Sequence, residues 1–223
     1  MENTSSLEVR ERILYAACKL FLEQGFQKTT MRQIADQAQV GLGLPSYYYG
    51  SKENLAIAFY QKMREKCLET VNGYADANVD PYTHLAMMIY LEFTINMACF
   101  YKLYYDCLES DIFYKYIMTT NTDTVTRIMK IEHKTVSNDL LQLYSVFVCS
   151  GIERTLVLNK PKGMFPTISY NEIPEYVFRS SVGTFSTDTA AIERAIGAAK
   201  RLVSNRSHIA SVFTLEYILD INA

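Results

Sequence analysis

The segment from residue 26 to residue 55 constrains the fold most strongly, because it contains two short helix patterns joined by a tight turn. Thr30 precedes Gln33 by three residues, the spacing at which two side chains cap each other's free backbone N–H groups at a helix start. Ile34 and Ala38 then recur at helical spacing and form an apolar face. The pattern predicts a short amphipathic helix that packs against a preceding one.

A turn at residues 39–41 follows this helix, and Gly41 is expected to adopt backbone angles or a capping position that a bulkier residue would resist. A second helix is expected over about residues 42–49, ending at Gly50, and Ser51 is placed to cap the next helix. Two short helices that cross at such a turn form a helix-turn-helix.

The N-terminal segment of the chain resembles a known family of DNA-binding domains. Thr-Met-Arg-Gln-Ile-Ala, followed by Val-Gly-Leu-Gly-Leu-Pro-Ser-Tyr-Tyr-Tyr-Gly-Ser-Lys-Glu-Asn-Leu, resembles the DNA-binding domain of the tetracycline-repressor (TetR) family over about residues 9–59. Three positions depart from the family pattern, which has Ser or Thr at Gly41, a non-proline apolar residue at Pro45 and Phe at Tyr49. Since proline is tolerated only near a helix start, we expect Pro45 to shorten or tilt the second helix.

The resemblance implies contacts with a double-stranded DNA operator. Phosphates would be held by Lys28, Thr29, Thr30, Arg32 and Lys52. Base edges would be faced by Leu42, Gly43, Ser46 and Tyr47, with Tyr48 reaching the DNA backbone. The alternative is that the three adjacent tyrosines only fill the core of a small domain, and Tyr49 fits that alternative best.

The rest of the chain also reads as helical, so the predicted fold class is all-α, with a C-terminal helical bundle for ligand binding and dimerisation. The predicted division is a helix-turn-helix domain at 1–50, a connecting helix at 51–74 and a ligand-binding and dimerisation domain at 75–223. Further helices are expected over about 81–109, from 119–126 onward, and over 137–159, 175–182, 188–202 and 207–221.

An aromatic and methionine-rich segment suggests a pocket for a small apolar or aromatic effector, with Glu92 or Asn96 as an orienting polar group. The candidate ligand-binding residues are Tyr90, Phe93, Asn96, Met97, Phe100, Tyr101, Tyr104, Met118, Tyr144 and Phe147. The alternative is ordinary core packing, since such side chains at helical spacing commonly pack against one another.

Charge and cysteine content agree with an intracellular DNA-binding protein without deciding it. The net charge is −2, but residues 1–66 carry nine Lys and Arg against seven Asp and Glu. The five cysteines form no Cys-x-x-Cys pair and no secretion signal is evident, so reduced thiols and a cytoplasmic location are expected. The apolar run at 89–100 is too short to span a bilayer.

Enzymatic function is not expected, because the three histidines are scattered and no phosphate-binding glycine loop lies in a strand-loop-helix context. No cofactor and no metal are predicted. Cys99 and Cys107 lie eight residues apart, which would suit redox sensing, but structural buried thiols are the better interpretation.

The sequence thus predicts a homodimeric transcriptional repressor that is released from a near-palindromic operator by an effector. Residues 139–158 and 190–202 are the expected dimer surface, because the second range is rich in small residues, although both faces could also be intramolecular core. One alternative is a DNA-binding regulator whose C-terminal domain binds a protein partner or no ligand. Another is a helical binding protein that has lost DNA recognition.

Overall fold

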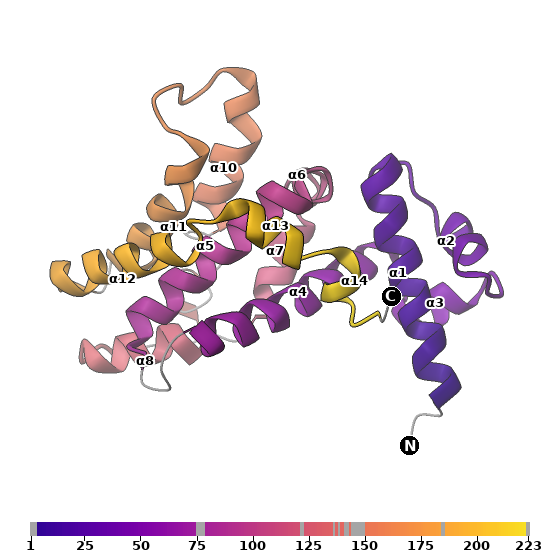
Figure 1. The fold of residues 1–223 in the computed structure, drawn as a ribbon, viewed down its shortest axis with the longest axis horizontal. Coiled ribbons are helices and arrows are strands. Elements are labelled where there is room, and N and C mark those ends of the chain that lie inside the picture. Colours follow the sequence, from indigo (N-terminus) through magenta and orange to yellow (C-terminus); the bar gives the residue numbers. More distant parts are fainter. Residues whose placement is uncertain are drawn as a thin grey trace.

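The computed structural model describes residues 4–74, 79–120, 123–135, 137, 139–140, 143, 150–183 and 186–221 (Figure 1). Within those ranges every regular element is a helix, which confirms the all-α class. The N-terminal helices are α1 (Thr4–Gln24), α2 (Met31–Ala38), α3 (Leu44–Tyr49) and α4 (Lys52–Tyr74). The following α-helices are α5 (Pro81–Cys99), α6 (Tyr101–Glu109), α7 (Ile112–Met118), α8 (Asp123–Ile131), α10 (Gly151–Asn159), α11 (Ile173–Gly183), α12 (Thr189–Leu202), α13 (Arg206–Val212) and α14 (Leu215–Ile218).

Helices α1 to α3 form a small domain at one end of the molecule (Figure 1). Its core is made by Ile13, Ala17 and Phe21 of α1, which are fully buried, together with Ile34 of α2. Gly25 ends α1 with a φ of +95°, a conformation that favours glycine. The chain can therefore reverse direction sharply between α1 and α2.

The start of α2 is as the sequence predicts, with Thr30 and Gln33 forming a capping box. The turn after α2 corrects one expectation, because Gln39 and not Gly41 takes the left-handed conformation, with φ 53°. Helix α3 is also shorter than expected. It begins at Leu44 and places Pro45 in its first turn, where a missing N–H costs little.

Helix α5 runs through the middle of the larger domain, and its N-cap Asp80 accepts bonds from the N–H groups of Tyr82 and Thr83, both at 3.1 Å. Helix α12 lies along it (Figure 1). The side chains of Ala195 and Ala199 on α12 are fully buried, and α12 makes its most extensive packing with α5. The small residues of α12 therefore permit close packing within one subunit, and most of this surface is unavailable to a second copy.

Three expectations about helix boundaries are corrected. The helix expected over 81–109 is broken at Phe100, which has φ −129° and ψ 24°, so α5 and α6 are separate. Helix α7 was not expected, and the last helix is divided into α13 and α14 by Phe213 and Thr214. Most of the helix expected over 137–159 lies outside the described residues, and its end is seen as α10.

The C-terminal segment returns to the N-terminal domain, so that α14 lies beside α1 and α4 (Figure 1). The hydroxyl of Tyr15 on α1 donates a hydrogen bond to Oε1 of Glu216 at 3.0 Å. Lys66 on α4 pairs with Asp220, with 2.5 Å between Nζ and Oδ1. These contacts connect the C-terminal segment to α1 through Glu216 and to the long helix α4 through Asp220.

Candidate functional site

The outer face of the helix-turn-helix presents several of the predicted DNA-binding residues to solvent. Tyr47 on α3 is 79% exposed and Leu42 in the turn is 62% exposed. Ser46 and Arg32 are exposed as well. Leu42 and Tyr47 thus place two large apolar or aromatic side chains at the solvent-facing side of the turn and α3, as on a binding surface. Lys28, Thr30 and Gly43 are also exposed on this part of the domain.

Thr29 differs from its neighbours because its side chain points into the domain. It is 1% exposed, and its hydroxyl donates a hydrogen bond to the backbone oxygen of Gly25 at 2.9 Å. This placement corrects the expectation that Thr29 offers its hydroxyl to a phosphate. Its role is to close the loop between α1 and α2.

Lys52 is also turned toward the domain, at the start of α4. Its ammonium donates hydrogen bonds to the backbone oxygens of Phe26 at 2.8 Å and Thr29 at 2.9 Å. The same ammonium lies 4.3 Å from the centre of the Phe26 ring, within the range of a cation–π interaction. Two of its three donors are therefore engaged within the domain, so its first role is to hold the loop before α2 against α4.

The three adjacent tyrosines have different environments. Tyr47 is free to solvent, whereas Tyr48 is half-buried with its ring edge-on to Tyr47 at a centroid distance of 5.0 Å. The hydroxyl of Tyr49 donates to the backbone oxygen of Arg10 on α1 at 3.0 Å, and the Arg10 guanidinium lies over its ring. Tyr49 is therefore a packing residue, as its alternative interpretation held.

The predicted ligand-binding residues do not come together around one cavity. Tyr90, Asn96, Phe100 and Tyr104 are buried, while Tyr101 and Met118 are exposed. Phe93 and Met97 line another hollow, of about 320 Å³, with Tyr170 and Arg206. Tyr144 and Phe147 lie outside the described residues. The amide of Asn96 is buried without a hydrogen-bond partner among the described residues.

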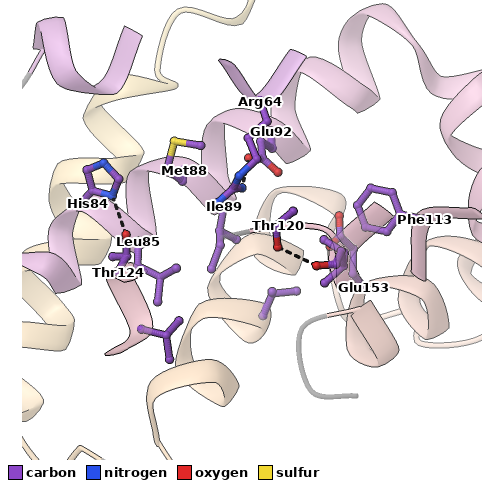
Figure 2. A pocket seen from close by; sticks show the side chains of 13 residues that line it. Arg64, His84, Leu85, Met88, Ile89, Glu92, Phe113, Thr120, Thr124 and Glu153 are labelled. Atoms are coloured by element: carbon purple, nitrogen blue, oxygen red, sulfur yellow. Dashed lines mark hydrogen bonds and ion pairs between the residues drawn. The ribbon is translucent and has the colours of Figure 1, made fainter. Parts of the chain in front are cut away.

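A cavity of about 100 Å³ instead lies on another face of α5 (Figure 2). It is enclosed by α4, α5, α7, α8, α10, α11 and the residues just before α8. Its lining residues are Arg64, His84, Leu85, Met88, Ile89, Glu92, Phe113, Ile117, Thr120, Thr124, Val125, Glu153 and Val177. None of the ten predicted ligand-binding residues is among them, so this cavity is a second candidate ligand site. Glu92, named as an orienting group, does line it.

The register of α5 explains why the two sets of residues differ. His84, Met88 and Glu92 repeat every four residues and so share one face, whereas Phe93 and Met97 lie on another. The sequence contained a usable signal. His84 and Glu92 are the histidine and the carboxylate of an otherwise mostly apolar helix, and such groups avoid burial unless they have partners or a function.

Two polar pairs lie in the cavity wall (Figure 2). Arg64 and Glu92 form an ion pair with 2.6 Å between Nη1 and Oε1. Burial raises the pKa of Glu92 and the Arg64 charge opposes that rise. His84 lies 3.4 Å from the hydroxyl of Thr124, and burial lowers its pKa. His84 is therefore favoured in its neutral form.

Glu153 on α10 is the second carboxylate in the wall, and it accepts a hydrogen bond from the hydroxyl of Tyr104 on α6. Burial raises the pKa of Glu153 to about 7, the Tyr104 hydroxyl lowers it, and the Glu92 charge raises it further. This side chain can therefore change its charge near neutral pH.

Helix α6 connects the cavity region to the helix-turn-helix. Asp106 on α6 accepts a hydrogen bond from the backbone N–H of Phe26 at 2.8 Å. Lys102 donates to the backbone oxygen of Glu23 at 3.0 Å, and Gln27 donates to the hydroxyl of Ser110 at 2.9 Å. The loop between α1 and α2 is thus held by α6 on one side and by Lys52 of α4 on the other.

A capped helix, a tight turn and a short exposed second helix define a helix-turn-helix DNA-binding domain. Residues 13–59 match the family model described as bacterial regulatory proteins, tetR family. The N-terminal domain of this chain therefore belongs to the tetR family, which confirms the resemblance seen in the sequence.

Individual relatives resemble this domain. The HTH-type transcriptional regulator HbdR of Aromatoleum sp. (strain CIB) is 48% identical over 77 residues, which are 34% of this chain and 32% of that protein. The HTH-type transcriptional regulator LmrA of Bacillus subtilis (strain 168) is 36% identical over 73 residues, 32% of this chain and 39% of that protein. The matched segments thus span about a third of these curated relatives.

Among solved structures, a gamma-butyrolactone receptor described as an ArpA-like protein aligns with 91% of this chain and 99% of its own. The identity is 14% and the TM-score 0.38, values too low to support an inference about this chain. No helix in the described part of the chain is long and apolar enough to cross a membrane. Over the same residues no group of His, Cys, Asp and Glu could hold a metal ion.

Proposed function

We propose that the protein is a ligand-responsive transcriptional repressor that binds a near-palindromic operator as a homodimer and is released by a small apolar or aromatic effector. The observation that carries this proposal is the attachment of one helix-turn-helix to one cavity-bearing domain through α4 and α6. The regulator names of the relatives that share the N-terminal domain support it.

The exposed residues of the helix-turn-helix suit the two tasks of DNA recognition. Tyr47 and Ser46 would face base edges, and Leu42 would contact a thymine methyl group, since it has no hydrogen-bond donor in its side chain. Lys28 and Arg32 would neutralise phosphates on either side of the groove. With Pro45 in its first turn, α3 is a short reading element, so shape and apolar contact would carry much of the specificity.

A homodimer follows from the size of this reading element, because one helix of six residues offers little affinity alone. Two half-sites separated by about one DNA turn, roughly 34 Å, would need two copies. We place the dimer face at α10 and α11, where Ile152, Leu156, Phe165 and Tyr176 line an apolar hollow. Tyr176 is 43% exposed there.

Release requires that the effector prefer a conformer that does not fit the operator. The cavity wall includes α4 and α7, and Tyr104 of α6 contacts the wall residue Glu153. An effector that displaced these helices would move Asp106 and Lys52, and with them the loop before α2. The distance between the two reading heads of the dimer would then change.

The first experiment is a mobility shift with DNA from upstream of the protein's own coding region, at two salt concentrations and with unrelated competitor DNA. A specific shift that weakens with salt would support the regulator and provide an assay for effector release. Tyr47→Ala is the matched variant that should lose the shift while keeping its melting temperature. If no shift is seen, the protein is tested next on a pool of random duplexes. If it binds none of them specifically, the result would contradict the proposal and favour a protein that has lost DNA recognition.

In the alternative, the C-terminal domain binds a protein partner or no ligand. A melting-temperature screen with small molecules distinguishes this alternative from the proposal. Any molecule that binds only the folded state raises the melting temperature. A specific DNA shift without a stabilising compound in an aromatic library would favour that alternative.

A further inference from the structure

The cavity contains more negative than positive charge. Its charged lining residues are one guanidinium, Arg64, and two carboxylates, Glu92 and Glu153. Arg64 is already paired with Glu92 at 2.6 Å. His84 is favoured as the neutral imidazole because burial lowers its pKa. Glu153 therefore remains as the carboxylate without a cationic partner in the wall.

In the described part of the chain, no basic side chain forms a hydrogen bond or ion pair with Glu153. The groups that shift its pKa, besides burial, are Tyr104 and Glu92, and neither is basic. Arg154 is adjacent in sequence, but its Nε donates to the backbone oxygen of Leu108 at 2.7 Å, and its Nη2 lies 3.4 Å from Asp111. Residues outside the described ranges include no Lys, Arg or His.

The surroundings of Glu153 suit a positive charge on an apolar body. Phe113 lines the cavity next to it, and the Phe113 ring is edge-on to the ring of Tyr104 at a centroid distance of 5.5 Å (Figure 2). Aromatic rings attract cations through their electron-rich faces. Leu85 and Ile89 give the other side of the cavity an apolar wall.

We propose that this cavity selects an effector that carries a protonated amine, or an equivalent cation, on a small apolar or aromatic body, with the cation bound by the carboxylate of Glu153. The inference rests on the proposed effector role of the cavity. Glu153 is partly buried, and a carboxylate withdrawn from water without a cationic partner carries a desolvation cost that a bound cation offsets. An anionic effector is disfavoured, because Glu92 already occupies Arg64 and Glu153 would repel it.

The test compares three probes of similar size on the full chain: benzylamine, benzyl alcohol and phenylacetate. Binding is measured by calorimetric titration at pH 8, where Glu153 is ionised and benzylamine is protonated. Benzylamine should bind at least about tenfold more tightly than benzyl alcohol, a factor typical of a buried charge pair. Phenylacetate should bind most weakly.

Glu153→Gln keeps the size of the side chain and removes its charge, so it should reduce the preference for benzylamine over benzyl alcohol to less than about twofold. Glu109→Gln changes an exposed carboxylate at the end of α6 and should leave the preference intact. Equal affinity for the amine and the alcohol, tighter binding of phenylacetate, unchanged preference in Glu153→Gln, or no binding of benzylamine would each overturn the proposal.

The DNA shift distinguishes this failure from failure of the proposed function. If a neutral or anionic compound binds and releases the operator, the effector role stands and the cationic class is wrong. If benzylamine binds through Glu153 but no duplex is recognised, the cavity chemistry stands and the regulatory role is wrong.

Discussion

The carboxylate of Asp106 accepts a hydrogen bond from the backbone N–H of Phe26 at 2.8 Å, across the boundary between the helix-turn-helix and the larger domain. Tyr104, two residues earlier on α6, donates to Glu153 in the cavity wall. Since residues two apart are separated by about 200° around a helix, α6 has one face toward the cavity and another toward the DNA-binding domain. A rotation or shift of α6 would therefore displace both the contact with Glu153 and the contact with Phe26.

Asp106→Ala should uncouple the two sites. The loop before α2 would keep its contacts with Lys52, so operator affinity should change by less than about threefold, whereas the effector concentration for half-release should rise severalfold. Mobility-shift titrations with a releasing compound measure both quantities. Glu109→Ala, on the exposed end of the same helix, is the control, and unchanged release in Asp106→Ala would exclude this route.

Lys52 and Lys28 should behave differently when replaced. Lys52→Met removes two hydrogen bonds to buried backbone oxygens and should lower the free energy of unfolding by about 1–3 kcal/mol, with operator affinity falling as a consequence. Lys28→Ala removes an exposed charge, so it should leave the melting temperature unchanged and reduce the salt dependence of DNA binding by about one unit of slope. Equal melting temperatures for the two variants would show that Lys52 does not support the fold.

Tyr47→Ala should weaken specific operator binding by about tenfold or more without loss of stability, because the ring is largely exposed and has little packing to lose. Tyr74→Ala, which removes an exposed ring from the end of α4, provides a matched control. A specific complex of undiminished affinity in Tyr47→Ala would remove α3 from the reading role.

Glu153→Gln should stabilise the protein in a pH-dependent way. The pKa of Glu153 is raised from 4.5 to about 7, so the native state binds a proton that the unfolded state has released between those values. Stability contributed by this group is therefore complete below about pH 4.5 and decreases as the pH rises to about 7. Glu92 and Tyr104 are the groups that act on it besides burial, and Arg64 and His84 share the cavity.

Melting curves at pH 5 and pH 8 measure this effect. The free energy of unfolding of Glu153→Gln should exceed that of the wild type by about 1–3 kcal/mol at pH 8, with a much smaller difference at pH 5. A pH-independent difference would mean that the carboxylate is ionised throughout this range.

Phe93→Ala separates core residues from cavity residues. Phe93 is 2% exposed, so its truncation should lower the free energy of unfolding by about 3–5 kcal/mol, while a compound that binds the cavity should lose little affinity. Ile89→Phe places extra volume in the cavity and should lower that affinity at small cost in stability. If Phe93→Ala instead lost affinity beyond its loss of stability, the ligand site would lie where the sequence alone placed it.

The local features of the helix-turn-helix could be predicted because they depend on residues close in sequence. The Thr30 and Gln33 capping box and the long helix after Ser51 are set by backbone hydrogen bonding within a few residues. The direction in which a side chain points, by contrast, depends on residues far away in the sequence. Nothing in the sequence near Lys52 reveals that its ammonium meets the oxygens of Phe26 and Thr29, more than twenty residues earlier.

By itself the sequence determined the helical class and the DNA-binding family of the N-terminal domain. Only the tertiary structure decided which residues line the hollow on each face of α5, because both faces are apolar and the elements that cover them come from distant parts of the chain. It also brought Glu153 to that cavity from α10, and it placed the small residues of α12 against α5. Helical periodicity gives the faces of each element, and only packing between elements gives each face its neighbour.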